Sequence, residues 1–246
     1  MPISRSLALA IHFVLDECVP PILRDRAWFT WLPFQLLFGR HAETFRSFKD
    51  RAHDLSPEEF RRVYAETAPV HLERPTDLNA ACLRRIRARI AGRTVLEVGC
   101  GRGHLAGLLA TAHDVTACDI AIDRALPARH PRVTFREENV ERLSFADRAF
   151  DTVVCTHTLE HVQDLDAAVR ELRRVARRRL IVVVPRQRPY RHTFDLHLHF
   201  FPLGHMLAAR FPPERGAGGR ILENVGGDWC YEEERVDTPL PAAQSA

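Results

Sequence analysis

Four residues at the end of an apolar run have the types and spacing of a ligand-binding turn. Glu97, Gly99, Gly101 and Gly103 stand in "VLEVGCGRG", and glycines let the main chain approach a ligand closely because they carry no Cβ. His104 occupies the place where a dinucleotide fingerprint has its third glycine, and the chain has no G-K-[ST] of a P-loop. Because the carboxylate of Glu97 repels phosphate, the turn favours a ligand with an ammonium or sulfonium centre.

A second group of candidate residues is rich in histidine. "CTHTLEHV" contains His157, Glu160 and His161, which on a helix would share one face and which also match the H-x-x-E-H pattern of zinc peptidases. In "HLHFF", His197 and His199 alternate with leucines, so both would point to one side of an extended chain. Two more histidines stand near by, so a metal cluster is an alternative, but the spacing fits no standard site and favours pocket-lining histidines.

The composition is that of an ordinary globular protein and limits the chemistry. The chain has 246 residues and a net charge of +3, with 46% hydrophobic and 27% charged residues. Lys49 is the single lysine, far from every motif, which excludes most lysine-based catalysis. The six cysteines show no C-x-x-C spacing and predict reduced core thiols in a cytoplasmic protein. No apolar run reaches the roughly 18 residues of a membrane span, and residues 7–15 favour an amphipathic helix over a signal peptide.

Residues 1–92 carry helical patterns broken by prolines. Ser56 and Glu59 have the spacing of a capping box, and an apolar stripe predicts a helix over residues 77–91. Pro33 interrupts a stretch of aromatic residues. We expect this stretch to pack against the rest of the molecule, although a membrane-surface or lid element is an alternative. The aromatic residues concerned are Trp28, Phe29, Trp31, Phe34 and Phe38.

Strands and helices alternate after residue 93. This order predicts an α/β fold with a doubly wound, mostly parallel sheet, in which ligands bind beyond the carboxyl ends of the strands. A Gly226-Gly227 turn predicts an antiparallel hairpin that brings the sheet to seven strands. The first five strands are expected at residues 94–100, 114–120, 132–140, 149–155 and 180–185.

With these motifs in place, the sequence resembles the class I S-adenosylmethionine-dependent methyltransferases over residues 94–185. The resemblance implies a Rossmann-like fold, S-adenosyl-L-methionine as cofactor, and roles for single residues. The glycines would line the cofactor, Glu97 would hold its aminoacid end, and Asp119 would accept hydrogen bonds from both ribose hydroxyls. The cofactor-binding residues implied in this way are Glu97, Gly99, Gly101, Gly103, Asp119, Asn139, Val140 and Cys155.

Three departures from the family pattern affect this interpretation. Asn139 stands where the family has an aspartate for the adenine amino group, and its carbonyl oxygen can still accept that bond. The family's Pro-Gly-Gly turn before the fifth strand is replaced by "VARRRLIVVVP". Ubiquinone-biosynthesis O-methyltransferases carry E-x-x-E-H at residues 157–161, where a divalent metal has been implicated, but here His157 replaces the first glutamate. We therefore assign no metal ligand.

The resulting hypothesis is methyl transfer to a hydroxyl (or amine) of a small-molecule or glycan acceptor. A histidine near neutral pKa suits the deprotonation of a hydroxyl, and the candidates are His161, His157 and His199, in that order. The N-P-P-[YF] signature of base methylation is missing, so no nucleic acid partner is expected. No transmembrane segment is expected either, and a peripheral membrane contact is left open. A nicotinamide oxidoreductase and an inactive binding protein of the same fold are the alternatives.

The expected division of the chain follows from these patterns. Residues 1–92 form a helical extension that covers the cofactor and shapes the acceptor pocket, with Arg74 facing the site or in a surface ion pair. Residues 93–237 form the S-adenosylmethionine-dependent methyltransferase domain, and residues 238–246 a disordered tail.

Overall fold

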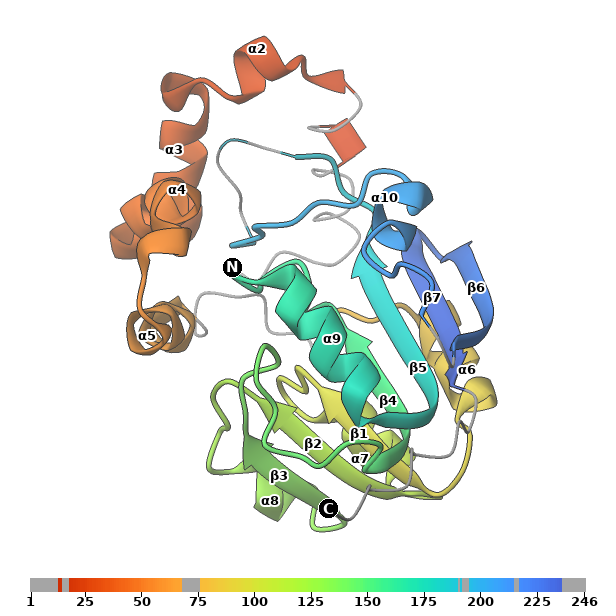
Figure 1. Ribbon diagram of the computed structural model, residues 1–246. Coiled ribbons are helices and arrows are strands. Elements are labelled where there is room, and N and C mark those ends of the chain that lie inside the picture. Colours follow the sequence, from red (N-terminus) through yellow and green to blue (C-terminus); the bar gives the residue numbers. More distant parts are fainter. Residues whose placement is uncertain are drawn as a thin grey trace, which may run out of the picture.

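The computed structural model describes residues 13–14, 18–67, 76–189, 191, 195–214 and 217–235. Its centre is a seven-stranded sheet in the order β3-β2-β1-β4-β5-β7-β6, with β1 to β5 parallel and β7 antiparallel to both neighbours (Figure 1). The predicted fold and the hairpin around Gly226-Gly227 are confirmed. The strands are β1 (Thr94–Val98), β2 (Asp114–Asp119), β3 (Val133–Glu137), β4 (Phe150–Thr156), β5 (Ala176–Pro185), β6 (Ala217–Val225) and β7 (Asp228–Arg235).

Helices cover both faces of the sheet, which explains why its central strands β1, β4 and β5 carry apolar side chains on both faces. On one face, α6 (Ala80–Arg89) and α7 (His104–Leu109) pack on Val95, Val154 and Ile181. On the other, α9 (Leu165–Val175) and α10 (Gly204–Ala208) pack on Leu96 and neighbouring strand residues. Successive residues of β1 thus enter opposite cores, as the alternation of side chains along a strand requires. A short helix, α8 (Leu126–Arg129), precedes β3.

Asn79 joins the start of α6 to the hairpin at the end of the chain. Its Oδ1 accepts a hydrogen bond from Cys82 N at 2.8 Å, which caps the helix. Its Nδ2 donates to Val225 O at 2.9 Å and to Asp228 Oδ2 at 2.8 Å. Because one side chain satisfies both elements, α6 is positioned against the β6–β7 turn.

Asp151 holds the amino ends of β1, β4 and β5 together. Its Oδ2 accepts hydrogen bonds from Arg93 N at 2.8 Å and Thr94 N at 3.1 Å, and its Oδ1 pairs with Arg177. Burial opposes ionisation, but these donors hold the pKa of the carboxyl well below its usual range. Strand β5 begins directly after α9, so the missing Pro-Gly-Gly turn is replaced by arginines that bind neighbouring strands.

The N-terminal helices form a separate layer beside the carboxyl ends of β4 and β5 (Figure 1). Its interior contains Phe34, Phe45, Phe48 and Phe60 and closes on Leu196, which belongs to the segment after β5. The expected capping box is present, because Ser56 N donates to Glu59 Oε2 and Glu59 N to Ser56 Oγ. The elements are α2 (Pro21–Arg24), α3 (Ala27–Phe38), η2 (Gly39–His41), α4 (Ala42–Arg51), η3 (Ala52–Asp54) and α5 (Pro57–Thr67).

Two expectations for this layer are wrong. Helix α3 runs through Pro33 without a break. The aromatic stretch is not buried as a whole, because Trp28 and Trp31 are 69% and 52% exposed and only Phe34 is fully enclosed, within the layer itself. The helix is apolar on all sides, so one layer of neighbours cannot cover it. Cys18 is likewise exposed, whereas the other five cysteines are buried.

Among the described residues, no helix combines the length and the apolar character that crossing a membrane requires. The predicted helix over residues 7–15, Arg74 and the predicted tail from residue 238 lie largely or wholly outside the described residues.

Candidate active site

The turn after β1 is shaped by three glycines in the left-handed region, with φ of +75°, +48° and +70° at Gly99, Gly101 and Gly103. Gly99 N and Cys100 N both donate to Cys118 O, at 2.8 and 3.0 Å, which ties the turn to β2. A Cβ on Gly99 would lie 1.9 Å from Thr158 Oγ1. At Gly101 no described heavy atom lies within 4 Å of the same position. The turn is therefore closed on the side of β4 and open at its tip.

Glu97 places a buried carboxylate beneath this turn. The residue is 2% exposed, and its Oε2 has no hydrogen-bond partner within the described part of the chain. Burial raises the pKa of the carboxyl to about 8, against one hydrogen bond from the Ala106 main chain. An unsatisfied buried carboxylate is costly by itself and stabilises a cationic ligand group. The site thus fits the ammonium of an aminoacid moiety.

Asp119 ends β2 beside the open tip of the turn. Its Oδ2 accepts a hydrogen bond from Gly101 N at 2.8 Å, and its Oδ1 accepts one from Ile120 N at 2.7 Å. Burial raises the pKa of this carboxyl, and the main-chain donors oppose the rise. Each oxygen has two lone pairs, so each retains capacity for one more donor. This arrangement can accept the two hydroxyls of a ribose.

The other three residues expected to contact the cofactor are less accessible to a ligand at the glycine turn. Glu138 N donates to Asp119 O at 2.9 Å, so the loop containing Asn139 and Val140 lies beside the end of β2. The Oδ1 of Asn139 accepts from Glu141 N at 2.9 Å, a local turn that competes with an adenine contact. Val140 and Cys155 are buried in the core under α9, where both pack against apolar neighbours. Their cofactor contacts stay predictions.

The loop after β4 is not a helix, contrary to the geometry considered for "HTLEH". His157 has a φ of +51°, and the next helix starts at Leu165 with Asp164 as its cap. The His157 ring lies between two carboxylates, with Nδ1 3.5 Å from Glu160 Oε1 and Nε2 3.5 Å from Asp228 Oδ2. Burial lowers the pKa of the ring, but the two carboxylates outweigh it and raise the pKa to about 10. His157 is thus protonated near neutral pH and unsuited to accept a proton.

His161 meets residues from two distant segments. The Tyr64 hydroxyl of α5 lies 3.1 Å from His161 Nδ1, and the rings of His161 and His197 pack edge to face with centroids 4.6 Å apart. His197 is 8% exposed, and its Nδ1 contacts Gln187 Oε1. Tyr64 and Gln187 were not expected from the sequence, since no local pattern distinguishes a buried partner of a remote histidine from any other polar residue.

His199 is turned away from this pair. Its Nε2 lies 2.9 Å from Val162 O, and burial lowers the pKa of the ring. The main-chain nitrogens of Leu198 and His199 both donate to Glu160 O, at 2.7 and 3.0 Å, which fixes this segment on the loop after β4. His199 therefore anchors the segment that carries His197, and the structure does not bring the three candidate histidines to one point.

Comparison with known proteins supports the cofactor assignment. Residues 96–184 match the family model described as "Methyltransferase domain". A protein of Mycolicibacterium smegmatis named as a probable S-adenosylmethionine-dependent methyltransferase is 39% identical over 100 residues, 38% of each chain. The ubiquinone biosynthesis O-methyltransferase of Paracidovorax citrulli is 39% identical over 99 residues, 37% of this chain and 42% of that protein. The chain thus spans about two fifths of the length of these relatives.

A solved structure shares the fold at low identity. The 1,6-didemethyltoxoflavin-N1-methyltransferase of Burkholderia thailandensis, with S-adenosylhomocysteine bound, aligns with a TM-score of 0.53 and 19% identity over 74% of this chain and 92% of that one. Strand order, glycine turn and these matches define the class I S-adenosylmethionine-dependent methyltransferase fold, whose cofactor is S-adenosyl-L-methionine. Residues 96–184 are the part of the chain that matches the methyltransferase domain family.

Proposed function

We propose that this chain transfers the sulfonium methyl of S-adenosyl-L-methionine to a hydroxyl (or amine) of a small-molecule or glycan acceptor. The observation that carries the proposal is the buried carboxylate of Glu97 beneath the glycine turn together with the half-buried carboxylate of Asp119 beside its tip. Glu97 has an unsatisfied oxygen for a cationic group, and Asp119 is held by two main-chain donors with capacity for a ribose. A pyrophosphate at the turn would be repelled by Glu97, which disfavours the nicotinamide oxidoreductase.

His161 is the proposed general base for a hydroxyl acceptor. The Tyr64 hydroxyl has two carbonyl acceptors at 3.4 Å, Leu196 O and His161 O, so it can donate there and accept from His161 Nδ1. This tautomer leaves a lone pair on Nε2. The Nε2 atom takes the acceptor proton while the acceptor oxygen bonds to the methyl carbon and the sulfur–carbon bond breaks. Orientation of the two reactants supplies much of the rate.

The hydroxyl is the preferred acceptor group. The Paracidovorax relative is named an O-methyltransferase, and an amine that binds unprotonated needs no base. The described site offers a half-buried histidine, His161, packed against the buried His197, and a hydroxyl acceptor can use this base whereas an amine does not need it. The contact of His161 with Tyr64 of the N-terminal layer supports a small-molecule acceptor held between the layer and the loop after β4.

The organisation of the chain is part of the proposal. We infer that residues 1–92 act as a helical cap over the acceptor and that residues 93–237 carry cofactor binding. The hydrogen bonds from Gln163 Nε2 to Ala52 O at 2.6 Å and to Leu55 O at 3.0 Å support this, because they join the cap to the loop after β4. A cytoplasmic location without nucleic acid partners is proposed from the free cysteines and the motifs.

Equilibrium dialysis with radiolabelled S-adenosylmethionine tests the cofactor directly. Saturable binding of one equivalent is expected, with S-adenosylhomocysteine as competitor. Saturable NADH binding, or no binding of either ligand, would contradict the proposal. A panel of phenolic, quinol and sugar hydroxyls, read by a 14 Da mass gain, then tests the acceptor class. Cofactor binding without transfer to any acceptor would favour the inactive binding protein of the same fold.

A further inference from the structure

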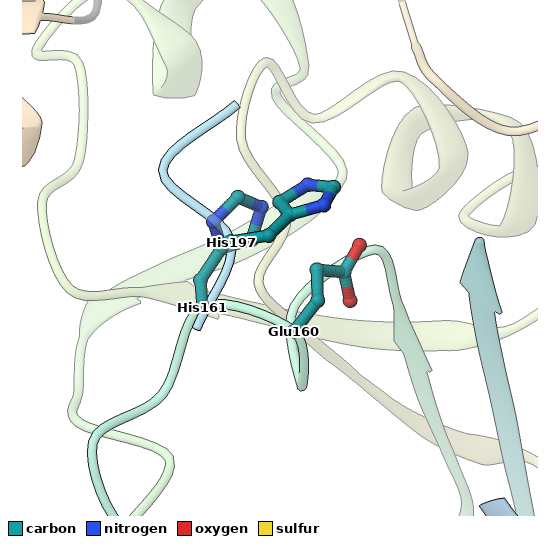
Figure 2. A group of neighbouring side chains, drawn as sticks. All are labelled: Glu160, His161 and His197. Atoms are coloured by element: carbon teal, nitrogen blue, oxygen red, sulfur yellow. The ribbon is translucent and has the colours of Figure 1, made fainter. Parts of the chain in front are cut away.

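One cluster of side chains beside the glycine turn is not used as a group by the proposed reaction. Glu160 and His161 in the loop after β4 converge with His197 from the segment after β5 (Figure 2). Each offers one ligand atom, and the three atoms lie within 4.8 Å of one another. A carboxylate and two imidazoles are the donor set of many catalytic zinc sites and of the facial triad of iron enzymes.

Glu160 provides an independent sign that a cation belongs here. The residue is 1% exposed, and neither of its carboxylate oxygens has a hydrogen-bond partner among the described residues. The Nδ1 atom of His157 lies 3.5 Å from Oε1, longer than a good charge-assisted hydrogen bond, and the same ring also faces Asp228. An ionised carboxylate buried in this way is strongly destabilising unless a cation compensates it. Figure 2 shows the Glu160 side chain next to those of His161 and His197.

Each of the two histidines contacts a polar side chain through one ring nitrogen, as histidines that bind metals do. Gln187 Nε2 donates to Asp195 Oδ2 at 3.4 Å, which orients the amide so that Oε1 faces His197 Nδ1. Because an amide oxygen only accepts, Nδ1 carries the hydrogen and the ring lone pair is on Nε2. Tyr64 contacts Nδ1 of His161 in the same way. Partners of this kind fix the tautomer and orientation of histidines that bind metals.

We propose that Glu160, His161 and His197 form a binding site for one divalent transition-metal ion of the zinc class. Ligand atoms around a tetrahedral zinc lie about 3.3 Å apart, so the cluster needs a modest contraction on binding. Three protein ligands leave a position open, and imidazoles disfavour Mg²⁺. The donor set differs from an E-x-x-E-H motif, because His197 comes from another segment and His157 is held by Asp228.

The ion has a role in catalysis that rests on the proposed function, whereas its binding does not. Thr158 packs on Gly99, so the loop with Glu160 and His161 adjoins the cofactor turn. An ion in the open cluster would lower the pKa of an acceptor hydroxyl that reaches it, and would replace His161 as the activating group.

Metal binding by the untagged full-length protein tests the site without cofactor or acceptor. We expect the protein to bind one equivalent of Zn²⁺ in isothermal titration and to show an absorption band in the visible region when Co²⁺ is bound. Mg²⁺ at the same concentration should not saturate the site. Glu160→Gln, His161→Ala and His197→Ala should each weaken Zn²⁺ binding by about a hundredfold or more. Gln187→Ala should weaken it by about 10- to 100-fold, as loss of a supporting residue does.

Two controls make the result decisive. His205→Ala removes an exposed histidine and should bind Zn²⁺ like the wild type. Glu160→Gln keeps the size and shape of the side chain but removes its charge, so the rise in melting temperature that Zn²⁺ causes in the wild type should be lost in this variant. No one-equivalent site in the wild type, or equal Zn²⁺ affinity in the three ligand variants, overturns the proposal. If a variant does not fold, the wild-type titration and Co²⁺ spectrum decide.

Discussion

The two halves of the site are built in different ways. The cofactor half is local, since Glu97, the glycines and Asp119 follow two adjacent parallel strands within 23 residues of sequence. The proposed acceptor half is assembled from three remote segments, which contribute Tyr64, His161 and His197. A sheet edge positions the first half through main-chain pairing, whereas the second depends on how a helical layer and two loops pack.

The difference predicts that the two halves respond separately to substitution. Changes in the cofactor half should alter the affinity for S-adenosylmethionine, and changes in the acceptor half should alter turnover alone. The contact of Thr158 with Gly99 is the exception, because it joins them. The substitutions below are ordered by the size of the expected effect.

His161→Ala should reduce kcat by about 10²- to 10⁴-fold, the usual contribution of a general base or of an activating group in its place. The dissociation constant of S-adenosylmethionine should stay within about twofold of the wild type. Steady-state rates and dialysis on the same preparation measure both quantities, with His205→Ala as the control. An equal loss of cofactor affinity would show that the halves are not separate.

Gly99→Ala should damage both halves, since its Cβ would lie 1.9 Å from Thr158 Oγ1 and the backbone is left-handed. The expected loss of folding free energy is about 3 kcal/mol, from strain and overpacking together. Gly101→Ala is the matched control, because its φ is also positive but the space is open. It should cost about 1 kcal/mol. Urea denaturation of the two variants measures the difference in the free energy of unfolding. Equal losses would show that the contact between Gly99 and Thr158 does not constrain the turn.

Asp119→Ala should weaken S-adenosylmethionine binding by about ten- to a hundredfold, the value of charge-assisted hydrogen bonds to two hydroxyls. Turnover at saturating cofactor should be nearly unchanged. Asp123→Ala is the control, because this carboxylate is exposed and serves Ala125 N and Arg129. Isothermal titration gives the affinities, and an unchanged value for Asp119→Ala would refute the ribose assignment.

Cofactor affinity should rise with pH between about 5.5 and 7.5. The Glu97 carboxyl has a pKa of about 8 because it is buried, so below this value it must release a proton to bind an ammonium group. Affinity therefore increases by at most about tenfold per pH unit and levels off above pH 8. The variant Glu97→Gln, measured by dialysis over the same range, should show a flat profile. If the affinity of the wild type did not change with pH, Glu97 would not contact the ammonium group of the cofactor.

Asn139→Ala should have the smallest effect, about threefold in cofactor affinity, because its Oδ1 is already engaged with Glu141 N. Titration of this variant beside Asp119→Ala tests whether the adenine contact exists. A loss as large as that of Asp119→Ala would mean that Asn139 changes its partner when the cofactor binds.

The cofactor half and the sheet could be predicted from the sequence because their signals are local. Strand β1 was expected at residues 94–100 and spans Thr94–Val98, and the apolar stripe of residues 77–91 corresponds to α6 (Ala80–Arg89). Glycine at three positions of the turn permits the positive φ values found there. Turn residues and hydrophobic periodicity predict such elements without knowledge of the tertiary structure.

The acceptor half could not be predicted in the same way. The left-handed backbone at His157 prevents the helix on which its face would have been shared, and no residue type announces that conformation. Contacts of Tyr64 with His161, or of Gln187 with His197, join positions that are distant in the chain. The exposure of Trp28 and Trp31 was missed because apolar composition alone does not say how many faces of a helix are covered.

Tyr64 lies before the segment 96–184 that the family model matches, yet its hydroxyl supports His161. A fragment limited to residues 96–184 would keep the proposed cofactor site but lose Tyr64, which holds the proposed base His161 in place. The residues that build the proposed active site therefore extend beyond the segment that is similar in sequence to the family. Exchanging the helical layer between related chains should change which acceptor is methylated while the donor stays the same, so diversity of substrate can arise without any change in the glycine turn.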